Sequence, residues 1–211
     1  MKAAQLLLGS DIGLWAVEFV EPASVTQVVA EDPEIRRVAR RRGIAASTRP
    51  KSAWRTLSIH YPRILSHEEL TSLGPTYNLH PGFLPWGRGH FPLVWAILDD
   101  EPAGATLHRM VARLDAGSIV DQTRVAVLAD DTGGSLHARL RHAEREMLRK
   151  WWPRLLNDSP ITERPQASGG SYHTKAEFES LLASDPRSVG PAILDRLRRA
   201  LTFPGKPGLG T

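Results

Sequence analysis

The sequence contains no cysteine among its 211 residues. This absence excludes disulfide scaffolds, catalysis by a thiolate and cysteine-ligated zinc, and it fits a reducing compartment. No apolar run approaches the roughly 18 residues that a membrane-spanning helix needs, so we expect no membrane partner. The apolar part of the N-terminus is very short and is soon followed by Ser10, Asp11 and Glu18, which argues against a signal peptide. We therefore expect a cytoplasmic protein.

Charge is uneven along the chain, although the net charge is only +4. Five arginines lie within seven positions, and they are Arg36, Arg37, Arg40, Arg41 and Arg42. This cluster suits either a nucleic-acid or phosphate patch or the solvated face of a helix whose apolar residues point inward. No aromatic residues that would stack on bases are interleaved with the arginines. The second interpretation is therefore favoured, and we predict no nucleic-acid partner.

Strand-like and helix-like segments alternate through the first eighty residues. Apolar or β-branched segments at 4–8, 25–30, 54–60 and 77–79 predict strands, and the segments between them predict helices at 12–20, 32–42 and 64–73. Ser66 and Glu69 form a capping box at the start of the last of these helices. Such alternation is typical of a parallel sheet. The predicted fold class is α/β, with a Rossmann-like, mostly parallel twisted sheet and helices on both faces.

The rest of the chain continues this pattern less regularly. It predicts a helix at 92–98, strands at 105–111 and 119–128, and a long helix after Asp131 and Thr132. The apolar positions of this helix keep helical spacing, and they are Leu136, Leu140, Ala143, Met147 and Trp151. We predict a catalytic domain over residues 1–156 and a short, loop-rich C-terminal extension over 157–211. The extension carries short helices at 175–182 and 192–201 and a Gly/Pro tail from Phe203.

The segment from Tyr77 to Gly89 carries the chemistry. Asn78 and His80 are two positions apart, so on a strand their side chains project to the same face, and Pro81 then ends the strand. Asn can donate a hydrogen bond to a developing oxyanion, and His can accept a proton near neutral pH. A strand end with a hydrogen-bonded His would look the same. The pair alone therefore does not decide between chemistry and structure.

The motifs around this pair, taken in order, are similar to those of the formyltransferase family whose members use 10-formyltetrahydrofolate. Asn78-Leu-His-Pro81 resembles the Asn-x-His-Pro signature of that family, and Pro85-Trp-Gly-Arg-Gly89 resembles the loop that follows it. Gly104-Ala-Thr-Leu-His108 resembles its Gly-x-Thr-x-His segment. Leu114-Asp-Ala-Gly-Ser118 resembles its Asp-Thr-Gly-Asp turn, with Ala116 and Ser118 as departures. Within the family, the likeness is closest to enzymes that formylate nucleotide-linked amino sugars.

The resemblance implies three catalytic residues for the transfer of one formyl carbon to an amine. Asn78 would donate to the oxyanion of the tetrahedral intermediate, His80 would take the proton of the amine, and Asp115 would orient His80. Read by itself, Asp115 is more readily interpreted as a turn residue that caps the amides of Gly117 and Ser118, and the catalytic role comes from the resemblance. His108 stays open between a supporting role and simple burial. The other histidines show no His-x-x-x-His or Glu-x-x-His pattern, so we predict no metal.

The resemblance also implies the binding residues. The folate would lie between Arg63-Ile64-Leu65-Ser66 and a loop that contains Leu114 and Gly117, at the carboxyl ends of the strands. The amine substrate would lie beside residues of the first turn and of the Pro-Gly loop: Gly9, Ser10, Trp86, Gly87, Arg88 and His90. Arg88 suits pairing with a phosphate or bracing of its loop against a carbonyl, and the sequence leaves both open.

The function implied is N-formyl transfer from 10-formyltetrahydrofolate to a small primary amine, with the amine of a nucleotide-linked amino sugar as the leading expectation. Three alternatives stay open: another small amine, such as an amino acid, a peptide-synthesis starter or a glycinamide-like compound; hydrolysis of formyltetrahydrofolate; and a non-catalytic basic binding module. A homodimer also stays open.

Overall fold

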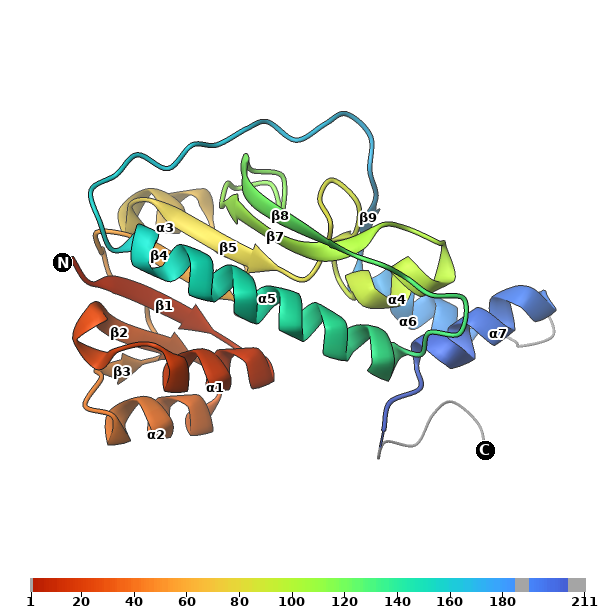
Figure 1. The fold of residues 1–211 in the computed structure, drawn as a ribbon, viewed down its shortest axis with the longest axis horizontal. Coiled ribbons are helices and arrows are strands. Elements are labelled where there is room, and N and C mark those ends of the chain that lie inside the picture. Colours follow the sequence, from red (N-terminus) through yellow and green to blue (C-terminus); the bar gives the residue numbers. More distant parts are fainter. Residues whose placement is uncertain (1, 185–189, 205–211) are drawn as a thin grey trace. The chain divides into compact units, whose positions relative to one another are not determined.

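The computed structural model of the chain describes residues 2–184 and 190–204 (Figure 1). One seven-stranded sheet has the order β3-β2-β1-β4-β5-β7-β8, and a two-stranded sheet pairs β6 with β9. The strands are β1 (Ala4–Leu8), β2 (Val25–Ala30), β3 (Ala46–Ser47), β4 (Thr56–Ile59), β5 (Thr76–His80), β6 (Arg88–Gly89), β7 (Ala103–Arg109), β8 (Ile119–Val125) and β9 (Tyr172–His173). The helices are α1 (Ser10–Phe19), α2 (Pro33–Arg41), α3 (His67–Leu73), α4 (Pro92–Leu98), α5 (Gly133–Leu155), α6 (Lys175–Ala183) and α7 (Pro191–Ala200), with a 3-10 turn at Pro22–Ser24.

The predicted mostly parallel sheet is confirmed. Strand pairs β1–β2, β1–β4, β2–β3 and β4–β5 are parallel. Strand β7 is antiparallel to β5, because Asn78 bonds to His108 while Thr76 bonds to Met110 further along β7. An antiparallel edge on an otherwise parallel sheet is common in α/β proteins.

Contacts divide the chain into two compact units. The first unit comprises residues 1–80, 107–121 and 144–165, and the second comprises 81–106, 122–143 and 166–211. Strands β7 and β8 and helix α5 contribute residues to both units. The predicted boundary at residues 156 and 157 stays a prediction, and most of the predicted C-terminal tail lies outside the described residues.

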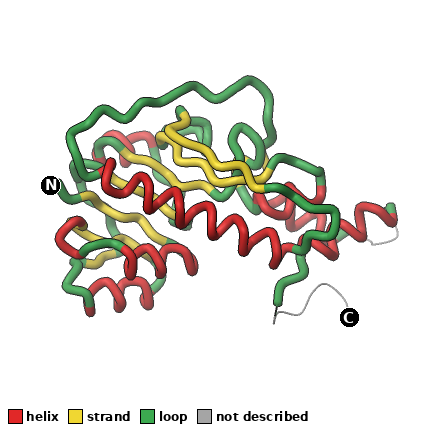
Figure 2. The backbone as a smooth tube through the Cα atoms, in the orientation of Figure 1, coloured by secondary structure: helices red, strands yellow, loops and turns green. Residues whose placement is uncertain are grey.

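Helices cover both faces of the sheet in the first unit (Figures 1 and 2). Leu65 and Leu73, at the two ends of the α3 segment, pack on Leu7 and Val29. Leu8 follows Leu7 in β1, so its side chain points to the other face of the sheet, where it lies against Gly13 of α1. The C-terminal part of α5 lies beside α1, since the guanidinium groups of Arg145 and Arg149 are each 5.2 Å from the ring centre of Trp15. All five residues of β1 are buried, as expected for a central parallel strand.

The second unit has its own core, made by α4, α7 and the first turns of α5. Val94, Ile97, Leu136, Leu140 and Ala200 are buried together. Helix α6 packs alongside through Phe178 and Leu181, next to Trp95, Leu98 and Leu197. Helices α6 and α7 therefore help to bury α4.

Local signals in the sequence explain most helix ends. Asp32 caps α2 by accepting from the amide of Glu34, and Ser66 and Glu69 form the predicted capping box. The apolar stripe of α5 is correct at four of its five predicted positions, but wrong at Trp151. Trp152 is the buried residue at 5% exposure, while Trp151 is partly exposed and donates its indole N–H to Asp121. An indole that finds a polar partner at the rim accounts for the difference.

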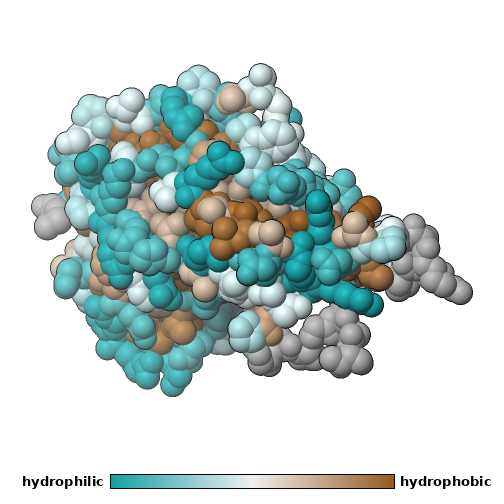
Figure 3. All heavy atoms as spheres, turned by 45° about the vertical axis from the view of Figure 1, so that its right-hand side comes forward, coloured by the Kyte–Doolittle hydropathy of each residue, from teal (hydrophilic) through white to brown (hydrophobic). Residues whose placement is uncertain are grey.

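Large apolar side chains are exposed at several described positions, among them Ile64, Leu128 and Tyr172. Figure 3 shows one face of the molecule coloured by hydropathy. Hydrophilic side chains cover much of the face shown, and hydrophobic ones gather in smaller patches. No helix in the described part of the chain is both long and apolar enough to cross a membrane.

Several arginines of the predicted cluster are held by backbone carbonyl groups: Arg36 donates to the carbonyls of Ala30 and Glu31, and Arg42 to that of Val17.

Candidate active site

Asn78, His80 and Asp115 lie together in the first unit, with His108 among them. Asp115 Oδ2 is 3.7 Å from His80 Nδ1, and Asp115 Oδ1 is 3.5 Å from His108 Nε2. Asn78 Nδ2 is 3.3 Å from His108 Nε2. His80, His108 and Asp115 are buried, with exposures of 4%, 1% and 8%. Two imidazoles, an amide and a carboxylate are therefore held in a poorly solvated cluster.

Strand geometry explains why these four side chains meet. Asn78 and His80 are among the last three residues of β5, and His108 is near the end of the antiparallel β7. The turn that carries Asp115 folds back on β7, because Arg109 N donates to Ser118 O over 2.8 Å. This close approach requires Gly117, since a Cβ there would lie 1.8 Å from the carbonyl oxygen of Arg109. Asp115 itself has φ of 50°, a left-handed conformation that is uncommon for residues other than glycine.

The hydrogen bonds of His108 indicate its tautomer. His108 Nδ1 is 2.8 Å from the carbonyl oxygen of Arg109, which can only accept, so Nδ1 carries a proton. In the neutral ring, Nε2 then accepts from the amide of Asn78. His108 therefore fixes the orientation of the Asn78 amide. The sequence left the role of His108 open, and only the tertiary contacts reveal this one.

Tyr77 supports the same strand end from the opposite face of β5. Its hydroxyl accepts from Arg109 Nη1 over 3.3 Å, and Arg109 in turn lies 3.8 Å from Glu163. Burial raises the pKa of Tyr77, so its hydroxyl stays protonated near neutral pH. This contact fixes the end of β7 next to Asn78.

The segment predicted to bind folate also lies in the first unit. Leu65 is buried in a cluster with Tyr61 and Met110, so the segment starting at residue 61 packs against the chain that follows β7. Ile64 is 66% exposed. Arg63 pairs with Glu69 over 3.0 Å, and Ser66 caps α3. An exposed apolar side chain on a segment outside helix and strand suits the flat face of a bound ring.

The residues predicted to bind the amine are distributed over both units. Gly9 and Ser10 follow β1 in the first unit, and a Cβ on Gly9 would lie 2.1 Å from the carbonyl oxygen of His60. The remaining four belong to the second unit.

In the second unit, Trp86 is 39% exposed and Gly87 donates its amide to Ser171 Oγ. Arg88 donates to the carbonyl oxygens of Gly169 and Ser171 over 3.3 and 3.1 Å, so it braces its loop. His90 has a buried Nδ1 without a hydrogen-bond partner among the described residues.

The second unit also contains three residues of types that can ligate metals. The ligand atoms of Asp99, Glu101 and His173 lie within 4.8 Å of one another. Glu101 accepts from Ser171 Oγ over 2.7 Å and is 3.4 Å from His173 Nε2, which stacks on Trp95. Burial, then the charge of Glu101, raises the pKa of Asp99. These contacts join the β9 segment to the end of α4, and no sequence spacing predicted them.

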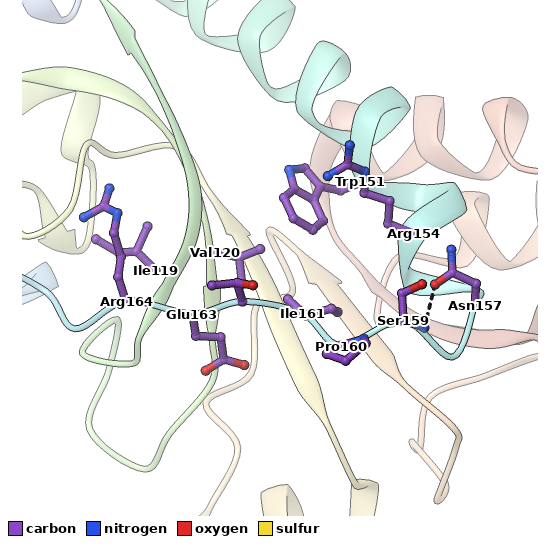
Figure 4. Close-up of a pocket in the computed structure, with 11 residues that line it drawn as sticks. Ile119, Val120, Trp151, Arg154, Asn157, Ser159, Pro160, Ile161, Glu163 and Arg164 are labelled. Atoms are coloured by element: carbon purple, nitrogen blue, oxygen red, sulfur yellow. Dashed lines mark hydrogen bonds between the residues drawn. The ribbon is translucent and has the colours of Figure 1, made fainter.

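A cavity of about 520 Å³ lies elsewhere in the first unit (Figure 4). Residues 157–164 pass over it from the end of α5, and Trp151 and Arg154 line its opposite side. Ile119 and Val120 of β8 complete the lining. None of the predicted catalytic or binding residues lines this cavity.

A family model described as formyl transferase matches residues 17–151, which include the whole cluster around Asp115. The chain belongs to the formyl transferase family. The resemblance read from the Asn78 to Ser118 motifs is thereby confirmed.

Curated relatives of this formyl transferase chain include dTDP-4-amino-4,6-dideoxyglucose formyltransferases of Mycobacterium tuberculosis and Mycobacterium bovis. Each is 38% identical over 127 residues, which are 59% of this chain and 53% of the relative. The chain thus spans about half the length of the curated relatives it matches.

Solved structures show the same fold. A 4-N formyltransferase from Francisella tularensis has a TM-score of 0.82 and 21% identity, covering 98% of this chain and 90% of its own. A sugar N-formyltransferase from a Shewanella species has a TM-score of 0.80 and 22% identity, covering 99% and 91%. The α/β fold predicted from the sequence is confirmed for this formyl transferase.

Proposed function

We propose that the chain transfers a formyl group from 10-formyltetrahydrofolate to the amine of a nucleotide-linked amino sugar. The observation that carries this proposal is the position of Asp115 between His80 and His108, with Asn78 hydrogen-bonded to the same His108. Membership of the family and the names of the curated relatives support the choice of donor and acceptor. The amine attacks the formyl carbon, the bond between that carbon and the folate nitrogen breaks, and the proton taken from the amine passes through His80 to the departing nitrogen.

Asn78 stabilises the negative charge that builds up on the formyl oxygen. Its amide nitrogen carries two N–H groups and donates one of them to His108, which leaves the other for the oxygen. Because His108 fixes the amide, this donor needs little reorganisation during the reaction. Loss of one such donor typically lowers the rate about 100- to 1,000-fold.

His80 accepts the proton of the attacking amine. Asp115 holds the ring from 3.7 Å and stabilises the imidazolium that forms. At an effective dielectric constant of about 20, two unit charges roughly 4 Å apart attract by about 4 kcal/mol. Burial of both groups makes this attraction stronger than it would be on the surface. Asp115 thus favours proton transfer to His80.

The donor and the acceptor approach this cluster from the predicted segments. Arg63 to Ser66 and the turn with Leu114 and Gly117 hold the folate, and the exposed Ile64 covers its ring. Gly9 and Ser10 border the amine in the first unit. In the second unit, Arg88 braces the loop that carries Trp86, Gly87 and His90, and amine binding by these residues stays a prediction from the sequence.

The test is an assay with 10-formyltetrahydrofolate and a panel of 3-amino and 4-amino nucleotide sugars. We expect tetrahydrofolate and a sugar 28 mass units heavier, because a formyl group replaces a hydrogen (about 28 Da by atomic masses). Formation of neither product across the panel would remove the sugar as acceptor. Release of formate without any amine would indicate hydrolysis of the donor instead.

Two variants test the roles of the residues. His80→Asn should lower kcat about 100- to 10,000-fold, as expected for the loss of a general base. His67→Asn is the matched control, because His67 is an exposed residue in the first turn of α3. Full activity of His80→Asn would refute the mechanism.

A further inference from the structure

A second histidine of the first unit, His60, connects an exposed serine with a buried glutamate. Ser10 Oγ is 3.2 Å from His60 Nδ1, and His60 Nε2 is 2.7 Å from Glu144 Oε1. The side chain of Glu144 is 0% exposed and that of His60 is 15% exposed, while Ser10 is on the surface. With Nε2 donating to Glu144, Nδ1 accepts from the Ser10 hydroxyl. The three residues form a serine–histidine–carboxylate chain.

The backbone is strained where this chain of hydrogen bonds is built. Ser10 has φ of 56° and His60 has φ of 51°, both in the left-handed region. A residue other than glycine is disfavoured in this region, and such strained residues cluster at functional sites. Gly9 makes the approach possible, since a Cβ at that position would lie 2.1 Å from the carbonyl oxygen of His60. The fold therefore maintains the Ser10–His60 contact at an energetic cost.

Ser10 also has the local setting of a nucleophile. It is the first residue of α1, directly after Gly9, which connects β1 to this helix. Leu8 of β1 pairs with Ile59 of β4, so Ser10 and His60 emerge at the same edge of the sheet. The first-turn amides of a helix have no intrahelical acceptor and can stabilise negative charge. In acyl hydrolases, the nucleophilic serine lies on a strand-to-helix turn of this kind, with an oxyanion hole made by backbone N–H groups.

We propose that Ser10 and His60, with Glu144 as a positioning residue, hydrolyse carboxylic esters. Ser10 Oγ attacks the ester carbonyl carbon while its proton passes to His60 Nδ1, and His60 then protonates the departing alkoxide. Water attacks the acyl-serine, gives a proton through His60 to Ser10 Oγ, and releases the carboxylic acid. The balance is ester plus water to acid plus alcohol. None of Asn78, His80 or Asp115 takes part, so the ester chemistry uses different catalytic groups from the proposed formyl transfer, although Ser10 also borders the proposed amine site.

The test uses the full chain with a fluorophosphonate probe and p-nitrophenyl acetate. We expect phosphonylation at one serine, mapped by peptide mass spectrometry to Ser10, and ester turnover that the probe abolishes. Ser10→Ala should lose both signals. His60→Gln should lower both rates about 100- to 10,000-fold, as for other general bases. Ser72→Ala is the matched control and should change neither, because the hydroxyl of this exposed serine bonds to the carbonyl of Glu69.

Glu144 acts through His60, so its variants need a readout that folding alone would not move. Glu144→Gln should lower kcat for the ester with KM unchanged, and Glu144→Asp should recover part of kcat. If Glu144→Gln does not fold, the mapped site and the His60→Gln rate on the folded chain still decide the question. Absence of labelling of the folded wild type, with no ester turnover above that of Ser10→Ala, would overturn the proposal. Labelling of Ser10 at full rate in His60→Gln would also overturn it.

Discussion

Replacing Gly117 with alanine would place a methyl group 1.8 Å from the carbonyl oxygen of Arg109. Ordinary contacts begin near 3.4 Å, and contacts below 3.0 Å essentially do not occur. The clashing oxygen belongs to the backbone and cannot rotate away as a side chain could. The turn that carries Gly117 and the end of β7 must therefore move apart. This substitution thus tests whether the close approach of the turn positions Asp115.

The size of the effect follows from the required movement. A separation of about 1.2 Å brings the contact from 1.8 to 3.0 Å, and it would lengthen the 2.8 Å bond from Arg109 N to Ser118 O to about 4.0 Å. Overpacking of this kind costs about 1–3 kcal/mol, and one lost hydrogen bond about 1 kcal/mol. We expect a total destabilisation of about 2–4 kcal/mol. For a chain of this length, that corresponds to a fall in Tm of roughly 4–16 °C.

Activity should fall by more than the loss of folded protein. The turn carries Asp115, and the carbonyl group it would push away is the acceptor for His108 Nδ1. A displacement of about 1 Å in a catalytic constellation typically costs about 100-fold in rate. The measurements are a thermal unfolding scan and kcat for formyl transfer well below the Tm of the variant.

The control is Gly190→Ala. No atom lies within 4 Å of a Cβ at Gly190, and its φ of −59° suits any residue. Alanine there should change the free energy of unfolding by less than about 1 kcal/mol, because the gain through the unfolded state opposes the poorer capping by alanine at the N-cap of α7. A Gly117→Ala protein that melts and turns over like Gly190→Ala would refute the reasoning about the turn.

Three further predictions concern other buried groups. Arg55 is 7% exposed and donates to the carbonyl groups of residues 154, 155, 157 and 159. Arg55→Met should therefore lower the free energy of unfolding, measured by chemical denaturation, by about 2–4 kcal/mol. The exposed Arg41→Gln is the control and should lower it by less than about 0.5 kcal/mol. Burial alone would raise the pKa of Asp131, but hydrogen bonds, chiefly from Arg139, outweigh it and lower this pKa. The ionised carboxylate therefore stabilises the fold fully above the pKa of the unfolded chain, near 3.8, and this stability is lost as the pH falls through the pKa of the folded protein. Asp131→Asn should have a lower Tm than the wild type at pH 7, and its Tm should fall less below pH 4. His108→Phe introduces a larger ring that cannot hydrogen-bond, so it frees the Asn78 amide and leaves the Arg109 carbonyl without this donor. It should lower kcat about 10- to 100-fold at temperatures well below the Tm of the variant; an unchanged kcat would contradict the role of His108.

Local sequence patterns predicted most of the helices and strands, and within the candidate site they predicted Asn78 and His80. The strand at 25–30, the helix at 92–98 and the capping box at Ser66 depend on neighbouring residues, so they could be read directly. The spacing of Asn78 and His80 placed both on one face of a strand for the same reason. Trp151 was wrong because helical spacing cannot distinguish a rim position from the buried position next to it.

Contacts between distant residues needed the tertiary structure. His60 and Glu144 are 84 positions apart, and no local pattern links them. The same holds for His108 and Asn78, and for the packing of α6 and α7 on α4. Such contacts depend on strand order and on close approaches at a few glycines, which are properties of the whole chain.

The α/β class, the family and the Asn78–His80 pair could be read from the residues alone, because they depend on periodicity and on motifs in order. The groups that surround this pair became known only from the folded chain. It brought Asp115 between two histidines through the turn at Gly117, and it joined Ser10 to Glu144 through His60. The physical reason is that side-chain chemistry is local, whereas the distance between two side chains is set by the packing of every element between them.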